Sequence, residues 1–336
     1  MHGTTTPSAA AWQLWRDRRG RLSWLRIAAI ALLLIPLVKA VVEYDTIVHG
    51  ARPLNDLIHR AGFWTLVFLG VTLAIAPFRH VARFGNLVDI RRIIGVGTFC
   101  YAAAHLSLFA ADQQFNLAKV AHEITHRVYL VIGFTAWLGL AALAITSTDR
   151  MQRRLGPIRW RRLHQIIYVI ALLALIHYFQ QTKADVTVPV LASSLFGWLI
   201  LYRVFAWWQD KNELSPVRLI ALALIVATLT FFGEAFGIAI AFHVSPMRVL
   251  ETAFDFDIGI RPGWQVLAAG LAVVAIDIVR SSGRASSRSS ARQQPKSRPS
   301  LGKRWTRSRS LSAVRCATAF RRRSRRLLAR CAGRRT

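Results

Sequence analysis

Apolar residues in this chain are gathered into long uninterrupted runs, separated by short polar segments. Eight runs approach the length needed to cross a lipid bilayer, which is about 20 residues in a helix. Within lipid, a backbone amide must find its hydrogen-bond partner in its own segment, so each run is expected to be a helix. The pattern therefore predicts an all-α integral membrane protein. The expected spans are Leu22–Val42, Phe63–Phe78, Ile93–Ala111, Val128–Thr146, Leu163–Phe179, Val188–Trp207, Leu219–Phe242 and Trp264–Ile278.

The polar segments between the runs predict how the helices are oriented. Arginines collect before the first span, between the second and third, and between the fourth and fifth, whereas the alternate segments are richer in acid. Cytoplasmic loops attract Lys and Arg. Both termini are therefore expected on the cytoplasmic side. The arginines are Arg16, Arg18, Arg19, Arg21, Arg79, Arg83, Arg91, Arg92, Arg150, Arg153, Arg154, Arg159, Arg161 and Arg162.

The start of the chain allows one other interpretation. Its basic residues, the first apolar run and Val38-Lys39-Ala40 together resemble a signal peptide with a cleavage site. The apolar stretch resumes after Lys39, which favours an uncleaved first span.

Composition separates the apolar body from a basic end. The 336 residues are 54% hydrophobic and 18% charged, yet the net charge is +29, from 45 basic and 16 acidic side chains. Residues 280–336 hold 19 of the basic residues and no acid. This distribution excludes a single soluble globule, and three cysteines exclude a disulfide framework.

The segment 280–336 is expected to be disordered, because Arg and Ser dominate it. Contact with anionic membrane lipid is the favoured role. Nucleic acid is not expected as a partner, since no folded module or interleaved aromatic residues accompany the charge. A non-native end produced by a shifted reading frame would have the same composition.

Three of the ten histidines lie inside predicted spans, where ionisable groups are costly and mark functional sites. His105 is 13 residues beyond Arg92, and His177 is 15 beyond Arg162. Both therefore lie about 20 Å from the cytoplasmic arginines, on spans that run in the same direction. Two facing imidazoles at one depth suit the axial ligands of a b-type haem, and a hydrogen bond between helices is the alternative interpretation.

The third histidine, His164, is placed near the cytoplasmic end of the span that contains His177, and cannot bind the same iron. A second haem, a contact with a propionate or flavin phosphate, and a solvated imidazole all remain open. His126, at the outer end of the fourth span, is a weaker candidate. The others are expected to be solvated or interfacial: His2, His49, His59, His80, His122 and His243.

Motifs that recur in order over three consecutive spans resemble one family. They are Arg91-Arg92-Ile93-Ile94-Gly95 with Phe99-Cys100-Tyr101 and His105, then Glu123-Ile124-Thr125-His126-Arg127-Val128-Tyr129 with Gly133-Phe134 and Ala144-Ile145-Thr146-Ser147-Thr148, then Arg154-Leu155-Gly156 with Trp160-Arg161-Arg162-Leu163-His164, Tyr168 and His177-Tyr178. This family is the haem-binding membrane subunit of the periplasmic methionine sulfoxide reductase system. It belongs to the ferric-reductase-like transmembrane superfamily.

The resemblance covers residues 24–208 and implies a six-helix ferric-reductase-like core at 22–208. A basic N-terminal segment (1–21) would precede the core. Two additional transmembrane helices (209–279) and the disordered tail (280–336) would follow it.

The resemblance also implies cofactors and partners. It implies b-type haem, one or two per chain, bound through His105 and His177 with His164 as a further candidate ligand, and it implies FMN. It also implies a location in a bacterial inner membrane. Electrons would come from the quinone pool or a cytosolic flavin reductase. They would pass to a periplasmic molybdenum-cofactor subunit, the catalytic partner in a heterodimer, which reduces methionine sulfoxide. This chain would then be an electron-transfer subunit without catalytic residues.

Two other functions remain as alternatives. One is a ferric reductase or oxidase-type cytochrome that works with a separate flavin reductase chain, because no Gly-rich strand–turn–helix pattern follows the spans here. The other is a non-redox transporter or scaffold, for which Glu234 in the seventh span is the best intramembrane acid.

Overall fold

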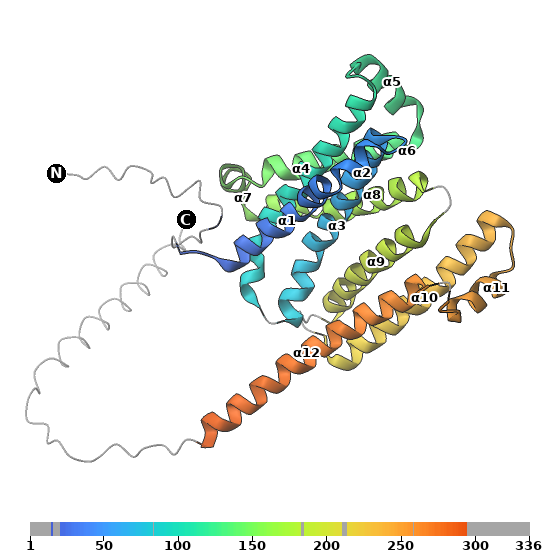
Figure 1. The fold of residues 1–336 in the computed structure, drawn as a ribbon. Helices are drawn as coiled ribbons and strands as arrows, with labels where there is room; N and C mark the ends of the chain where they lie inside the picture. The colour runs from blue at the N-terminus through green and yellow to red at the C-terminus, as the bar shows by residue number, and fades with distance from the viewer. Residues whose placement is uncertain are drawn as a thin grey trace, which may run out of the picture. The chain divides into compact units, whose positions relative to one another are not determined.

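A computed structural model of the chain describes residues 15, 21–82, 84–182, 185–209, 214–257 and 259–293 (Figure 1). The regular elements of these residues are helices. Eight helical segments are long and apolar enough to span a membrane, and the fifth of these, Asp149–Gln181, contains two of the helices given below. The predicted all-α membrane fold is thus confirmed. Most of the basic N-terminal segment and residues 294–336 of the expected tail lie outside the described residues.

The helices that can span a membrane follow one another along the chain with short connections. Short helices occur on the way at α2 (Tyr44–Val48), α5 (Leu117–His126) and α11 (Pro246–Glu251), with 3-10 turns at Gly85–Leu87 and Thr252–Phe254. The longer helices are α1 (Trp24–Val42), α3 (Pro53–Val81), α4 (Val88–Asp112), α6 (Val128–Thr146), α7 (Asp149–His164), α8 (Ile167–Gln181), α9 (Thr187–Trp208), α10 (Pro216–Phe242) and α12 (Pro262–Gln293).

The second span begins earlier than its apolar run. The helix was expected from Phe63, but α3 begins at Pro53. Proline favours the first turn of a helix because its missing N–H is not needed there. As a result, His59 belongs to a transmembrane helix and not to a loop.

The fifth span is interrupted near its N-terminal end. One helix was expected to carry both His164 and His177, but α7 ends at His164 and α8 begins at Ile167. Gln165 and Ile166 bond to carbonyls three residues earlier, which tightens the chain into a turn between the two helices. Gly156, inside α7, has φ +74°, a left-handed conformation that favours glycine.

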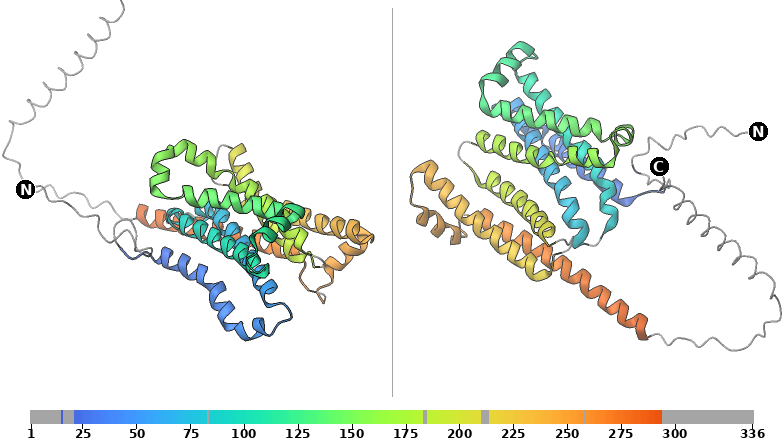
Figure 2. Two further views of the ribbon diagram at one scale, coloured as in Figure 1. Left: turned by 90° about the horizontal axis from the view of Figure 1, so that it is seen from above. Right: turned by 180° about the vertical axis from the view of Figure 1, so that it is seen from behind.

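Two helix pairs build the centre of the fold. α3 packs along α4, and α6 packs along α8, with α4 also in contact with α6. Figure 2 shows these helices from two further directions, with α9 between them and α10. Arg203 of α9 donates to the backbone carbonyl of Leu73 in α3, and its guanidinium lies 5.3 Å from the centre of the Tyr168 ring in α8. A half-buried arginine therefore connects α9 to both pairs.

The last two long helices pack against each other and against α9. Gly270 of α12 lies against Ala223 of α10 and near the indole of Trp198 in α9. Glu234 of α10 is only 4% exposed and pairs with Arg261 at 3.3 Å. The acid that the transporter interpretation singled out thus has a partner at the start of α12.

The disordered tail was expected to begin at residue 280, but α12 continues to Gln293. No proline occurs between 280 and 293, and Pro295 is the first residue that disfavours helix for its predecessor. The early part of the expected tail is therefore helical.

Candidate functional site

A cavity of about 530 Å³ lies between the two central helix pairs, at the end of the fold to which α5 belongs. This volume is within the usual range of small-molecule and cofactor sites. Its walls come from α3, α4, α5, α6 and α8. They are largely apolar and aromatic, and include Leu66, Leu106, Phe109, Leu130, Phe134, Trp137 and Tyr178.

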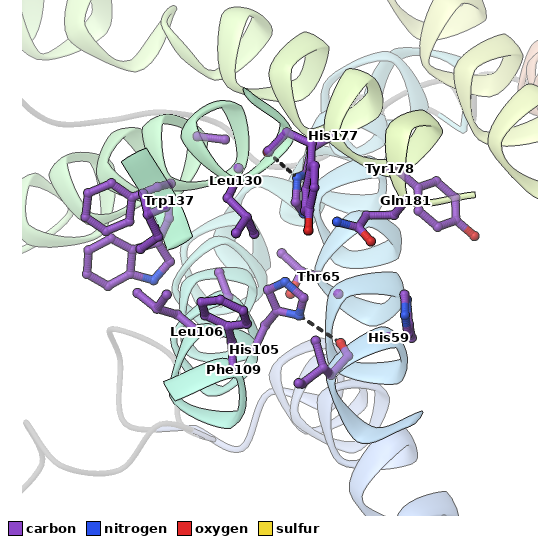
Figure 3. Close-up of a pocket in the computed structure, with 18 of the residues that line it drawn as sticks. His59, Thr65, His105, Leu106, Phe109, Leu130, Trp137, His177, Tyr178 and Gln181 are labelled. Carbon is purple, nitrogen blue, oxygen red and sulfur yellow. Dashed lines mark hydrogen bonds between the residues drawn. The ribbon is translucent and has the colours of Figure 1, made fainter. Parts of the chain in front are cut away.

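Two histidines from different helix pairs face each other in this cavity. Figure 3 shows His105, from α4, and His177, from α8, pointing toward one another. Their ring centroids are 6.3 Å apart, and the ring planes meet at 81°. Sequence spacing placed the two imidazoles at one depth, and the structure brings their rings together.

Each imidazole is fixed by a hydrogen bond to backbone. Nδ1 of His105 donates to the carbonyl of Ile58, and Nδ1 of His177 donates to the carbonyl of Tyr129, both at 2.8 Å (Figure 3). Because a carbonyl only accepts, Nδ1 carries the proton in both rings. Each neutral ring then presents a lone pair at Nε2, so the two rings cannot hydrogen-bond to one another.

The distance between the rings suits a metal ion held between them. Two metal–imidazole bonds of about 2 Å each, extended to the ring centres, place the centroids of two axial ligands roughly 6 to 7 Å apart. The observed 6.3 Å lies in that range. The two imidazoles, the apolar walls and the cavity volume therefore fit a haem.

One buried polar atom of the wall also lacks a hydrogen-bond partner in the part of the chain that the structure describes. Nε1 of Trp137 is buried and makes no hydrogen bond to any other described residue. Buried donors are normally paired. The cavity therefore offers a bound group one N–H donor, from Trp137, in addition to the two unprotonated imidazole nitrogens.

Polar side chains also line the cavity. His59 and Asn55 come from α3, and Lys119 and Glu123 come from α5. Arg127, between α5 and α6, pairs with Glu123 at 2.6 Å. A hydrogen bond to the Tyr129 hydroxyl raises the pKa of Arg127, and the nearby Glu123 acts in the same direction. The cationic side chains of Lys119 and Arg127 could bind the carboxylates of a haem.

His164 does not line this cavity. Its ring stacks on Trp160 at 4.0 Å, its Nδ1 donates to the Trp160 carbonyl at 3.1 Å, and its Nε2 lies 3.4 Å from Oγ of Ser147. Among the described residues, no group of three or more His, Cys, Asp and Glu side chains is arranged to hold a metal ion. The structure thus brings His105 and His177 together and leaves His164 apart.

The other histidine candidates also separate. His126 lies on α5 with its ring 3.9 Å from that of His122, both exposed, and neither lines the cavity. His59, which was expected to be solvated or interfacial, is exposed and also lines the cavity. Arg52-Pro53 was the available signal, since a proline-initiated helix would have placed His59 inside the span.

Comparison with known proteins identifies the family to which this sequence is similar. Residues 60–175 match the family model described as "Ferric reductase like transmembrane component". The relatives below carry the name "Protein-methionine-sulfoxide reductase heme-binding subunit MsrQ". The protein from Herminiimonas arsenicoxydans is 37% identical over 167 residues, which is 49% of this chain and 77% of the relative. The protein from Xanthomonas campestris pv. campestris strain B100 is 41% identical over 157 residues, 46% of this chain and 72% of the relative.

The chain belongs to the MsrQ family. A third member, from Ralstonia nicotianae, is 35% identical over 192 residues, 56% of this chain and 88% of that protein. The family resemblance inferred from the sequence motifs is confirmed, and the chain is a bacterial multi-pass membrane protein. The matched family model includes His105 and His164 and ends two residues before His177. No solved structure matches this chain significantly.

Proposed function

We propose that this protein is the haem-binding, electron-transfer membrane subunit of a methionine sulfoxide reductase system. The observation that carries this proposal is the pair of imidazoles, His105 and His177, facing each other 6.3 Å apart in an apolar cavity. The names of the MsrQ relatives, which describe them as heme-binding, support it.

Haem, when bound, supplies reversible one-electron exchange at its iron. The chain supplies the two ligands and their surroundings. Donation from Nδ1 to a backbone carbonyl keeps Nε2 of each imidazole unprotonated and raises its basicity as a ligand. Phe109, Phe134 and Leu130 line the cavity and limit the access of water. Arg127 and His59, which also line the cavity, are proposed to face the propionates.

We further propose that electrons cross from the cytoplasmic side to the periplasmic side. The positive-inside assignment places the cavity in the outer half of the membrane and His164 near the cytoplasm. The proposed acceptor is a periplasmic molybdenum-cofactor subunit that reduces methionine sulfoxide in proteins. The donor, quinol or a cytosolic flavin reductase, rests on the family resemblance, as do FMN and a second haem at His164.

Electron delivery between defined partners tests the function. Purified protein in lipid vesicles is reduced with a quinol and then mixed with the oxidised periplasmic reductase and methionine sulfoxide. The expected result is sulfoxide reduction that depends on this subunit and falls by at least an order of magnitude in His105→Ala and His177→Ala. Ferric citrate, offered in place of the reductase, tests the ferric reductase alternative. The proposal is wrong if ferric citrate is reduced and sulfoxide reduction does not depend on this subunit.

A further inference from the structure

The two imidazoles of the cavity are seated on their neighbouring helices in the same way. His105 donates to the carbonyl of Ile58 and lies against Gly62, and both of these residues are on α3. His177 donates to the carbonyl of Tyr129 and lies against Gly133, both on α6. In each case the glycine follows the accepting carbonyl by four residues, which is one helical turn.

Steric contact explains why these positions are glycine. A Cβ atom on Gly133 would lie 2.8 Å from both Nδ1 and Cε1 of His177, closer than real Cβ contacts. A Cβ atom on Gly62 would lie 3.1 Å from Cε1 and 3.2 Å from Nδ1 of His105. The same edge of the imidazole faces the glycine in both seats.

Helix geometry explains the four-residue spacing. Side chains on a helix point toward its N-terminus, so a residue covers the turn that precedes its own Cα. A side chain at position 62 or 133 would therefore cover the carbonyl one turn earlier, which is the one that accepts the Nδ1 proton. Glycine leaves that carbonyl open to a side chain from another helix.

Three other close-packed glycines of the fold lie against an apolar side chain and not against a histidine. Gly97 lies against Leu33, Gly139 against Ile170, and Gly263 against Phe231. Those are apolar contacts of the kind that small residues allow between membrane helices. At Gly62 and Gly133, by contrast, the three nearest atoms all belong to one histidine ring.

We infer that Gly62 and Gly133 are positioning residues, each of which seats one of the two imidazoles on the carbonyl four residues earlier and thereby aims its Nε2 at the iron. The inference rests on the proposed function, since it assumes that the two imidazoles bind haem. It adds that the ligand geometry is set by a pair of carbonyl–glycine seats on α3 and α6.

Alanine substitutions test the seats one at a time. Gly133→Ala should displace the His177 ring and break its bond to Tyr129, whereas Gly62→Ala, with the longer contact, should have the smaller effect. A Cβ atom on Gly197 in α9 would meet no neighbouring atom within 4 Å, so Gly197→Ala is the matched control. The full-length protein is purified, and its haem-to-protein ratio, ferrous absorption spectrum and haem midpoint potential are measured.

For Gly133→Ala we expect either loss of haem or, where haem is retained, a more positive midpoint potential. The sign follows because an imidazole that no longer donates through Nδ1 is less basic and stabilises the ferric state less. Gly62→Ala should shift the potential in the same direction by a smaller amount, and Gly197→Ala should match the wild type.

The outcome that overturns the inference is a wild-type haem ratio, spectrum and potential in both Gly133→Ala and Gly62→Ala. If Gly133→Ala does not accumulate in the membrane, Gly62→Ala decides by itself in the same way. Absence of haem from the wild-type protein would instead overturn the proposed function, so the two failures are distinguishable.

Discussion

At the scale of single residues, the surroundings of each histidine decide what it can bind. His105 and His177 are each held by one backbone carbonyl and face each other across a cavity. His164 also donates to a carbonyl, but its second nitrogen faces Ser147, a hydroxyl, instead of another imidazole. The three histidines of the predicted spans therefore divide into a facing pair and a separate residue at the end of α7.

This division predicts the effect of replacing His164. In His164→Ala, the absorption bands of the haem held by His105 and His177 should persist, because the substitution removes nothing from the cavity. Loss of the stacked contact with Trp160 should cost about 1 kcal/mol of stability. The measurement is the haem-to-protein ratio with the reduced spectrum. A partial fall in the ratio would indicate a second haem, and disappearance of the whole signal would contradict the assignment.

At this scale, the sequence identified the pair of histidines but not the carbonyl–glycine seats that position them. Counting residues from Arg92 and Arg162 placed His105 and His177 at one depth, because helical rise is regular. No such rule identifies Gly62 and Gly133. Their role depends on which helix each imidazole packs against, and that is a tertiary contact.

At the scale of helices, apolar runs predicted where the spans lie but not where the helices begin or break. Hydrophobicity marks the apolar run of α3, whereas the first ten residues of this helix begin at Pro53 and precede that run. The turn between His164 and Ile167 was missed because the hydrophobic run continues through it. That turn removes His164 from the helix that carries His177.

The junction of α10 and α12 gives a prediction at this scale. Arg261 pairs with buried Glu234 and also donates to Oγ1 of Thr252 at 3.1 Å. In Arg261→Ala, Glu234 would stay buried without its partner, which should cost about 3 kcal/mol. The thermal unfolding temperature should fall while the haem spectrum is unchanged, since neither residue lines the cavity.

The matched control for this prediction is Arg248→Ala on α11, where the arginine is exposed. Its unfolding temperature should equal that of the wild type. Equal unfolding temperatures for Arg261→Ala and the wild type would show that the ion pair does not secure the last two helices.

At the scale of the whole molecule, the distribution of charge and apolar residues was the most informative part of the sequence. Eight apolar runs became eight helices able to span a membrane, because in lipid almost no other backbone arrangement satisfies its own amides. The ion pair of Arg92 with Asp149 joins α4 to α7 beside the predicted cytoplasmic loops. Charge composition could not predict that α12 continues to Gln293, because it does not report helix propensity.

The most direct test of the account is the dithionite-reduced absorption spectrum of the purified protein and of three variants. The wild type should show a Soret band and the α-band of a b-type haem. His105→Ala and His177→Ala should each lose the haem of the facing pair, while His122→Ala, a replacement of an exposed histidine on α5, should keep it. A wild-type protein without these bands, or a full haem signal in either cavity variant, would contradict the claim that His105 and His177 hold a haem between them.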